Sequence, residues 1–174
     1  MNGISIIICC YNSEQRIKDT LKYLLKQYVP SERPWEVILV DNCCTDNTLN
    51  IARQTWETSI VPFKIVSENK EGLAYARLCG IQAAQYEYLS MIDDDNWVAE
   101  NWIEKVGEIM DSSKFIGALG GCSTPQPEIP PPNWFPKYEM CYAVGHQGTD
   151  TEDVTDTRQF LWGAGLCIRR AAWN

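Results

Sequence analysis

Short apolar runs alternate with amphipathic segments along the first three-fifths of the chain. Continuous runs rich in β-branched residues, as at 4–10 and 36–40, are typical of strands buried on both faces. Between them, apolar residues recur at a spacing that gives one helical face, as at Ile17, Leu21, Leu24, Leu25 and Tyr28 ahead of Pro30. This alternation predicts a three-layer, Rossmann-like α/β fold with a mainly parallel central sheet. The elements we expect are strands at 4–10, 36–40, 63–66, 86–92 and 115–119, and helices from Ile17 toward Tyr28, from 45 or 46 to 56, over 71–84 and over 102–110.

The pattern changes after residue 121. Five prolines within 125–132 predict extended chain, because proline cannot continue a helix or an inner strand. An acidic loop over 149–156, a strand-like piece over 160–165 and a helical start over 169–173 follow, with no helix-ending signal. We therefore divide the chain into an α/β half, 1–121, and the start of a second half, 122–174, and expect it to be a fragment.

Charge and cysteine content narrow the function classes. A net charge of -8 argues against a nucleic-acid partner, which would need a surplus of Lys and Arg. The eight cysteines form no CxxC pair and there is one histidine, so we expect free thiols in a reducing compartment and no structural zinc. The apolar run at 4–10 is too short for a signal peptide. We expect a cytoplasmic protein, and a peripheral place at the inner membrane face stays open for the full-length protein.

Polar side chains follow four of the predicted strands. The carboxyl ends of parallel strands meet at one edge of a sheet, where ligands of such folds bind. We therefore expect these groups to share one edge: Tyr11, Asn12 and Glu14; Asp41 and Asn42; Asn69, Lys70 and Gly72; and Asp93, Asp94 and Asp95.

The run Asp93-Asp94-Asp95 is the sharpest chemical signal. Three adjacent carboxylates after a buried strand repel one another and lose solvation. Mg2+ or Mn2+ would offset both, because these ions prefer a few carboxylates together with phosphate oxygens. The alternative is a solvated turn that caps the next helix.

Other candidates also have two interpretations each. Asp41 could bond a base or ribose edge, or cap a turn; Tyr11 could stack on a base, or lie at the rim. Arg77 could pair with phosphate, or be a surface arginine. Trp162, beside Gly163, could form the floor of a sugar site or belong to the core. The acidic loop and His146 are expected to be solvated or structural.

Four motifs, in this order and spacing over residues 1–121, resemble the family-2 glycosyltransferases of GT-A fold. They are ISIIICCYNSE, VILVDNCCTDNT, ENKEGLAYAR and YLSMIDDDN, the last resembling the family's DxD element. WGAGLCIRRAAW, near the end, resembles the segment that precedes the family's catalytic carboxylate.

The resemblance implies a donor site and an inverting transfer. Nucleotide contacts would come from Cys9, Tyr11, Glu14, Asp41, Arg77, Asp93 and Asp94. Asp93 and Asp95 would reach the cation, Mn2+ or Mg2+, and Trp162 and Gly163 would lie on the sugar or acceptor side. The donor would be a nucleoside diphosphate-sugar, UDP-linked by preference, and the acceptor hydroxyl would belong to a saccharide or a lipid-linked molecule.

The chain departs from the family pattern in two places, and each departure leads to an expectation about the protein. Cys43-Cys44 replaces the usual Gly-Ser, which puts the turn geometry in question because glycine eases a positive φ. The family's base lies in a Glu-Asp pair beyond the WGAG segment, so we expect it after Asn174 and expect this chain to bind donor without efficient transfer.

The residues alone leave two alternative functions open. A sugar-1-phosphate nucleotidyltransferase would need a glycine-rich basic loop after the first strand, where this chain has Cys-Tyr-Asn-Ser-Glu. A receiver-like module with an acidic pocket would use Asp41 as phosphoacceptor, with its acids at the ends of the first and middle strands. Here the first strand offers Glu14 only after a turn, and the carboxylate cluster follows the fourth strand.

Overall fold

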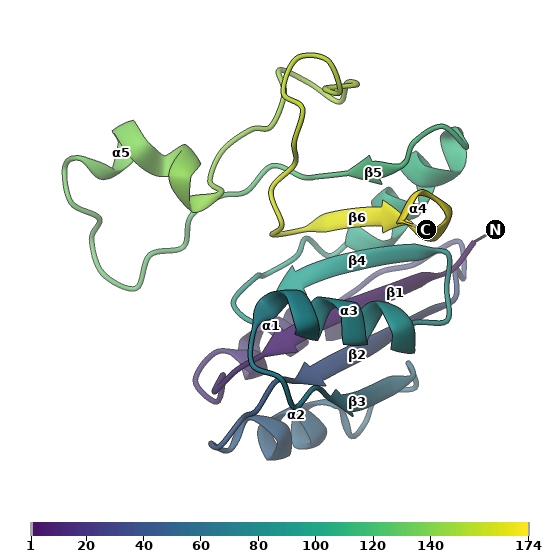
Figure 1. The fold of residues 1–174 in the computed structure, drawn as a ribbon, viewed down its shortest axis with the longest axis vertical. Helices are drawn as coiled ribbons and strands as arrows, with labels where there is room; N and C mark the ends of the chain where they lie inside the picture. The colour runs from purple at the N-terminus through teal and green to yellow at the C-terminus, as the bar shows by residue number, and fades with distance from the viewer. Residues whose placement is uncertain (1, 174) are drawn as a thin grey trace.

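A computed structural model describes residues 2–173, and the strands in this range form one six-stranded sheet. Its order is β3-β2-β1-β4-β6-β5 (Figure 1). The first four strands in sequence are mutually parallel, whereas β6 runs antiparallel to β4 and β5 antiparallel to β6. The predicted mainly parallel α/β sheet is therefore confirmed. The strands are β1 (Ile4–Cys10), β2 (Trp35–Asp41), β3 (Phe63–Ser67), β4 (Tyr88–Asp93), β5 (Ala118–Leu119) and β6 (Leu166–Arg169).

Helices cover both faces of the sheet. Successive residues of the inner strands point to opposite faces, and apolar side chains occur on each face. Ile6 and Ile8 of β1 join a core with α1 (Ile17–Leu25), α2 (Thr48–Trp56) and α4 (Trp102–Ser112). Ile7 packs on the other face, against α3 (Leu73–Ala83), which lies across the sheet in Figure 1.

The first helix is shorter than its pattern predicts. It ends at Leu25, with Lys26 as its C-cap, so Tyr28 lies beyond it and is 70% exposed. Leu25 is also exposed, whereas Ile17, Leu21 and Leu24 are fully buried. The predicted buried face is correct for those three residues and wrong for Leu25 and Tyr28.

The second half contains few regular elements before it rejoins the sheet. The proline-rich segment projects away from the sheet and is followed by the short helices α5 (Phe135–Tyr138) and η1 (Glu139–Tyr142) (Figure 1). The strand expected over 160–165 is wrong: Gly165 has a φ of +70°, and the strand β6 begins after it. A final helix, α6 (Arg170–Trp173), follows β6. Over residues 2–173, no helix has the length and apolarity needed to cross a bilayer.

Helix α3 packs unusually close to the sheet. A Cβ added at Gly80 would overlap Cγ2 of Ile7 and lie 3.1 Å from Cγ2 of Val40. Glycine at this position therefore sets the separation between α3 and the two central strands. The same helix begins at the sheet edge that carries the polar strand ends.

An ion pair between buried Arg33 and partly exposed Asp111 links α4 to the segment before β2, and Arg33 also contacts the start of the chain. Arg33, 4% exposed, donates to the Asp111 carboxylate at 2.9 Å and to the carbonyl of Asn2 at 2.7 Å. Tyr88 donates its hydroxyl to the other oxygen of Asp111 at 2.5 Å. Burial opposes ionisation of Asp111, but the hydrogen bonds from Tyr88 and Arg33 outweigh it and lower its pKa.

Candidate functional site

The carboxyl ends of the four parallel strands meet at one edge of the sheet, as the strand order requires. Asp41 of β2 is the register partner of Cys10 in β1 and of Ser67 in β3. Asp93, at the end of β4, is the partner of Cys9. Since neighbouring strands lie about 4.8 Å apart, the aspartate run starts one strand away from the loop that carries Tyr11.

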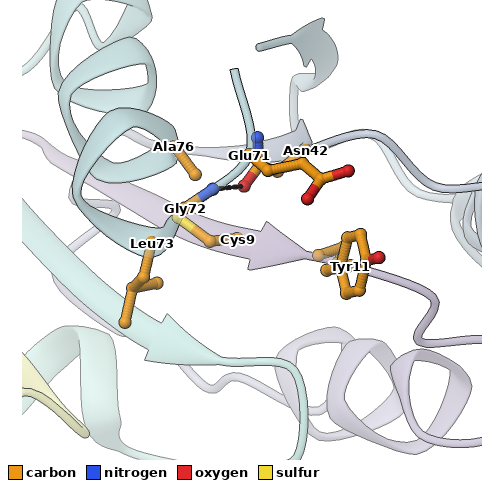
Figure 2. Close-up of a pocket in the computed structure, with 8 residues that line it drawn as sticks. Cys9, Tyr11, Asn42, Glu71, Gly72, Leu73 and Ala76 are labelled. Carbon is orange, nitrogen blue, oxygen red and sulfur yellow. Dashed lines mark hydrogen bonds between the residues drawn. The ribbon is translucent and has the colours of Figure 1, made fainter. Parts of the chain in front are cut away.

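A cavity of about 470 Å³ opens at this edge, between the end of β1 and the start of α3 (Figure 2). Of the residues proposed from sequence, Cys9 and Tyr11 line it. Asn42 and Gly72 also line it, and both were expected at this ligand-binding edge, whereas Cys10, Glu71, Leu73 and Ala76 were not assigned to a site from sequence.

The walls of the cavity are mostly apolar. Burial raises the pKa of the Cys9 thiol to about 12; Arg77 opposes this shift and Asp93 adds to it. Cys9 is therefore a neutral, small apolar group at neutral pH rather than a nucleophile. Tyr11 is 55% exposed at the mouth, where its ring face is open to a planar ligand.

Asn42 fixes the loop that forms the far wall. Its side-chain amide donates to the carbonyls of Glu68 (3.0 Å) and Lys70 (2.8 Å) and accepts from the backbone N–H of Gly72 (2.8 Å). The residue is 4% exposed, so these hydrogen bonds are sheltered from water. One amide, just after β2, therefore makes three of the hydrogen bonds that hold the loop between β3 and α3.

The turn after β2 keeps a positive φ without glycine. Cys43 has a φ of +64°, which costs an ordinary residue roughly 1–2 kcal/mol. The Asp41 carboxylate accepts from the backbone N–H of Cys44 at 2.9 Å, and closes the turn. The Cys43-Cys44 replacement therefore preserves the left-handed turn at an energetic cost, and Asp41 does not line the cavity.

Glu14 lines a second cavity, of about 500 Å³, together with Asn12 and Asp46. Its carboxylate accepts from the backbone N–H of Asn47 at 3.0 Å, and its own N–H donates to Asp46 at 3.0 Å. These contacts join the loops after β1 and β2. They give Glu14 a structural role, and its role beside a nucleobase stays a prediction.

The three aspartates differ in their partners. Asp93 lies 3.4 Å from the guanidinium of Arg77, and both side chains are partly exposed. Asp94 is held by the start of α1: Ser13 and Arg16 donate to its carboxylate, and Thr20 donates to its carbonyl. The Asp94 side chain therefore has a structural role in addition to any contact with a ligand.

Asp95 is the least compensated carboxylate of the run. Burial raises its pKa, and the charges of Asp94 and Asp93 raise it further, against a smaller opposing effect of Arg16. The carboxylate oxygens of Asp93 and Asp95 suit Mg2+ or Mn2+, and a cation would relieve this repulsion. No cluster of three or more His, Cys, Asp or Glu side chains that could hold a metal occurs within 2–173, so diphosphate oxygens and water would have to complete the coordination.

The WGAG segment reaches the same region through Gly163. A Cβ added there would lie 2.9 Å from Nη2 of Arg77, so the guanidinium packs on the glycine backbone. Trp162 donates its backbone N–H to the side chain of Gln147 at 2.7 Å, and Arg158 stacks 4.6 Å over its ring. Gly163 thus lies beside Arg77, whereas the Trp162 ring packs with Arg158.

Solved structures share this architecture. TarS from S. aureus aligns over 97% of this chain and 47% of its own, with a TM-score of 0.73 at 22% identity. A mannosyltransferase from Pyrobaculum calidifontis, solved with GDP-Man and Mn2+, aligns over 71% of this chain and 36% of its own, with a TM-score of 0.64 at 24% identity. The fold is therefore the GT-A fold.

The sequence match is more specific than the fold. The model of glycosyl transferase family 2 matches residues 5–170, and the chain belongs to this family. The glycosyltransferase GlyG of Streptococcus pneumoniae is 34% identical over 101 residues, which is 58% of this chain and 33% of GlyG. The chain thus spans about a third of that relative. Family membership supports neither the nucleotidyltransferase nor the receiver-like alternative.

Proposed function

We propose that this chain forms the donor-binding part of an inverting glycosyltransferase. It would transfer a sugar from a nucleoside diphosphate-sugar, preferably UDP-linked, to a hydroxyl of a saccharide or lipid-linked acceptor. One observation carries the proposal: a largely apolar cavity at the end of β1 lies one strand away from the carboxylates of Asp93 and Asp95. Such an arrangement can hold a base and a diphosphate at the same time.

The related proteins support this donor class. TarS, a poly(ribitol-phosphate) beta-N-acetylglucosaminyltransferase of Staphylococcus aureus, has been solved with UDP and with UDP-GlcNAc, and the Pyrobaculum enzyme with GDP-Man and Mn2+. The name of TarS gives poly(ribitol-phosphate), a polymer that carries free hydroxyls, as its acceptor, which supports a hydroxyl acceptor for this chain.

The chemistry of each side chain suggests which part of the donor it would contact. Cys9 and Tyr11 would enclose the base, with Asp41 and Glu14 on the loops around it. Arg77 would neutralise phosphate charge, since a guanidinium can bind two phosphate oxygens at once.

The aspartate run would serve the ribose and the cation. Asp93 and Asp94 would reach the ribose side, and Asp93 and Asp95 would hold Mn2+ or Mg2+. When bound, the ion would stabilise the negative charge that develops on the departing diphosphate. Trp162 and Gly163 would border the sugar and its acceptor.

Three further expectations stay predictions. They are the division at residue 121, a base beyond residue 174 with inefficient transfer by this chain alone, and a cytoplasmic location with a peripheral membrane position open.

A thermal-shift panel of nucleotides and nucleotide-sugars, with and without Mn2+, tests the donor proposal. A ligand at a hundred times its Kd adds about 2.7 kcal/mol of stability, or roughly 5–10 °C in Tm for a chain of this size. We expect a manganese-dependent shift with UDP or a UDP-sugar that Asp95→Asn removes. Asp156→Asn, which removes an exposed carboxylate in the acidic loop, is the control and should keep it. A Tm that stays constant across all nucleotides would refute the proposal.

A further inference from the structure

The carboxylate of Glu71 lies at the cavity that the proposed function assigns to the base. Glu71 lines this cavity together with Tyr11, Leu73 and Ala76. In Figure 2 its carboxylate extends from the far wall toward the side on which Tyr11 lies. A charged acceptor thus borders a site whose other walls are mostly apolar.

The backbone on both sides of Glu71 is fixed. The carbonyl of Lys70 and the N–H of Gly72 both bond to the side chain of Asn42, each at 2.8 Å. The N–H of Lys70 also donates to the Glu68 carboxylate at 2.8 Å. The backbone of Glu71 is therefore already positioned, and on ligand binding only the side chain of this residue would still have to be ordered.

The Glu71 carboxylate is free to accept a ligand donor. Throughout residues 2–173, neither an ion pair nor a side-chain hydrogen bond engages it. The adjacent cation, Lys70, is directed elsewhere, with Nζ 3.8 Å from the centroid of the Tyr75 ring. Asp41, the acid at the end of β2, accepts from Cys44 and does not line the cavity.

The chemistry of a free carboxylate at a base site selects for donors. A carboxylate accepts hydrogen bonds and cannot donate them, so it favours a base edge that carries a ring N–H. Uracil and guanine present such an N–H. The corresponding ring nitrogen of cytosine and adenine is a hydrogen-bond acceptor, so its lone pair would repel the carboxylate oxygen. Discrimination of this kind rests on repulsion of the wrong base as much as on attraction of the right one.

We propose that Glu71 determines base specificity by accepting the ring N–H of uracil or guanine at the cavity wall. This inference rests on the proposed donor-binding function. It assigns to Glu71, rather than to Asp41 alone, the selection of the nucleotide.

Titration calorimetry with UDP, GDP, CDP and ADP in the presence of Mn2+ tests the inference. We compare the wild-type chain with Glu71→Gln and with Glu57→Gln, a control that makes the same charge change at an exposed position after α2. Loss of the charge-assisted bond should weaken binding of the preferred nucleotide by about tenfold. Because the glutamine amide can donate to cytosine, the UDP-to-CDP affinity ratio should fall as well.

The outcomes separate the two proposals. Wild-type selectivity for UDP or GDP that collapses in Glu71→Gln and survives in Glu57→Gln supports the role of Glu71. Unchanged affinity and selectivity in Glu71→Gln overturn that role and leave donor binding intact. A wild-type chain that binds none of the four nucleotides overturns the donor function, and the inference with it.

Discussion

Replacing Asn42 probes how the sheet edge holds the cavity wall. Its amide makes two donor bonds and one acceptor bond to the loop between β3 and α3. At about 1 kcal/mol net for each hydrogen bond, Asn42→Ala should lower the free energy of unfolding by about 2–4 kcal/mol. Asn42→Asp keeps the acceptor for Gly72 but turns a carboxylate oxygen toward two carbonyls at a 4% exposed position, so it should cost more than the alanine change.

The two variants also differ in their pH dependence. The new carboxyl in Asn42→Asp is favoured in its neutral form, because the protonated group can donate to one of the carbonyls. Its pKa in the folded state is therefore raised, and the variant should regain stability as pH falls from 7 to 5. Asn42→Ala introduces no titrating group and should follow the wild-type pH profile over this range.

Urea unfolding followed by tryptophan fluorescence at pH 7 and pH 5 measures both effects. Asn50→Ala is the control, because Asn50 is exposed and bonds to the neighbouring Asn47 side chain; its change should stay within about 0.5 kcal/mol. The reasoning is refuted if Asn42→Asp is more stable than Asn42→Ala at pH 7, or if both match the wild type.

Two further predictions concern the packing of the fold. Gly80→Ala should destabilise by about 1–2 kcal/mol, because overpacking against the sheet exceeds the gain in helix propensity, whereas exposed Gln82→Ala should be near neutral; a rise in the urea midpoint for Gly80→Ala would contradict this. Asp111→Asn should lower stability at pH 7, since buried Arg33 loses its charged partner. Because the folded-state pKa of Asp111 is lowered, the wild type should be more stable than Asp111→Asn by its full amount above the ordinary pKa of an aspartate. This difference in the free energy of unfolding should disappear as pH falls through the folded-state pKa. A difference between the two proteins that stays constant with pH during acid unfolding would contradict this.

The inner half of the sheet was predictable because its strands are apolar on both faces. The strand expected over 4–10 has those bounds in the structure, and the parallel order then determines that Asp41 and Asp93 share an edge. The second half was harder to predict. Its aromatic-glycine run over 160–165 looks like a strand, but the positive φ of Gly165 delays β6 until the next residue.

The cavity wall shows a second limit of prediction. The positions of Glu71 and Gly72 depend on Asn42, which lies about thirty residues earlier in the chain. No periodicity or local motif records a bond between a strand end and a distant loop. Sequence could indicate that polar groups gather at this edge, but not which carboxylate borders the cavity and which one closes a turn.

The segment between β5 and β6 leaves and re-enters the sheet at neighbouring points, because Leu119 is paired with Cys167. Lengthening such an excursion costs little, since closing a loop of twice the length adds only about 0.6 kcal/mol. Insertions and deletions there need not alter the register of the four parallel strands. Descendants of one ancestral gene could therefore diversify this outer excursion while inheriting the inner sheet unchanged.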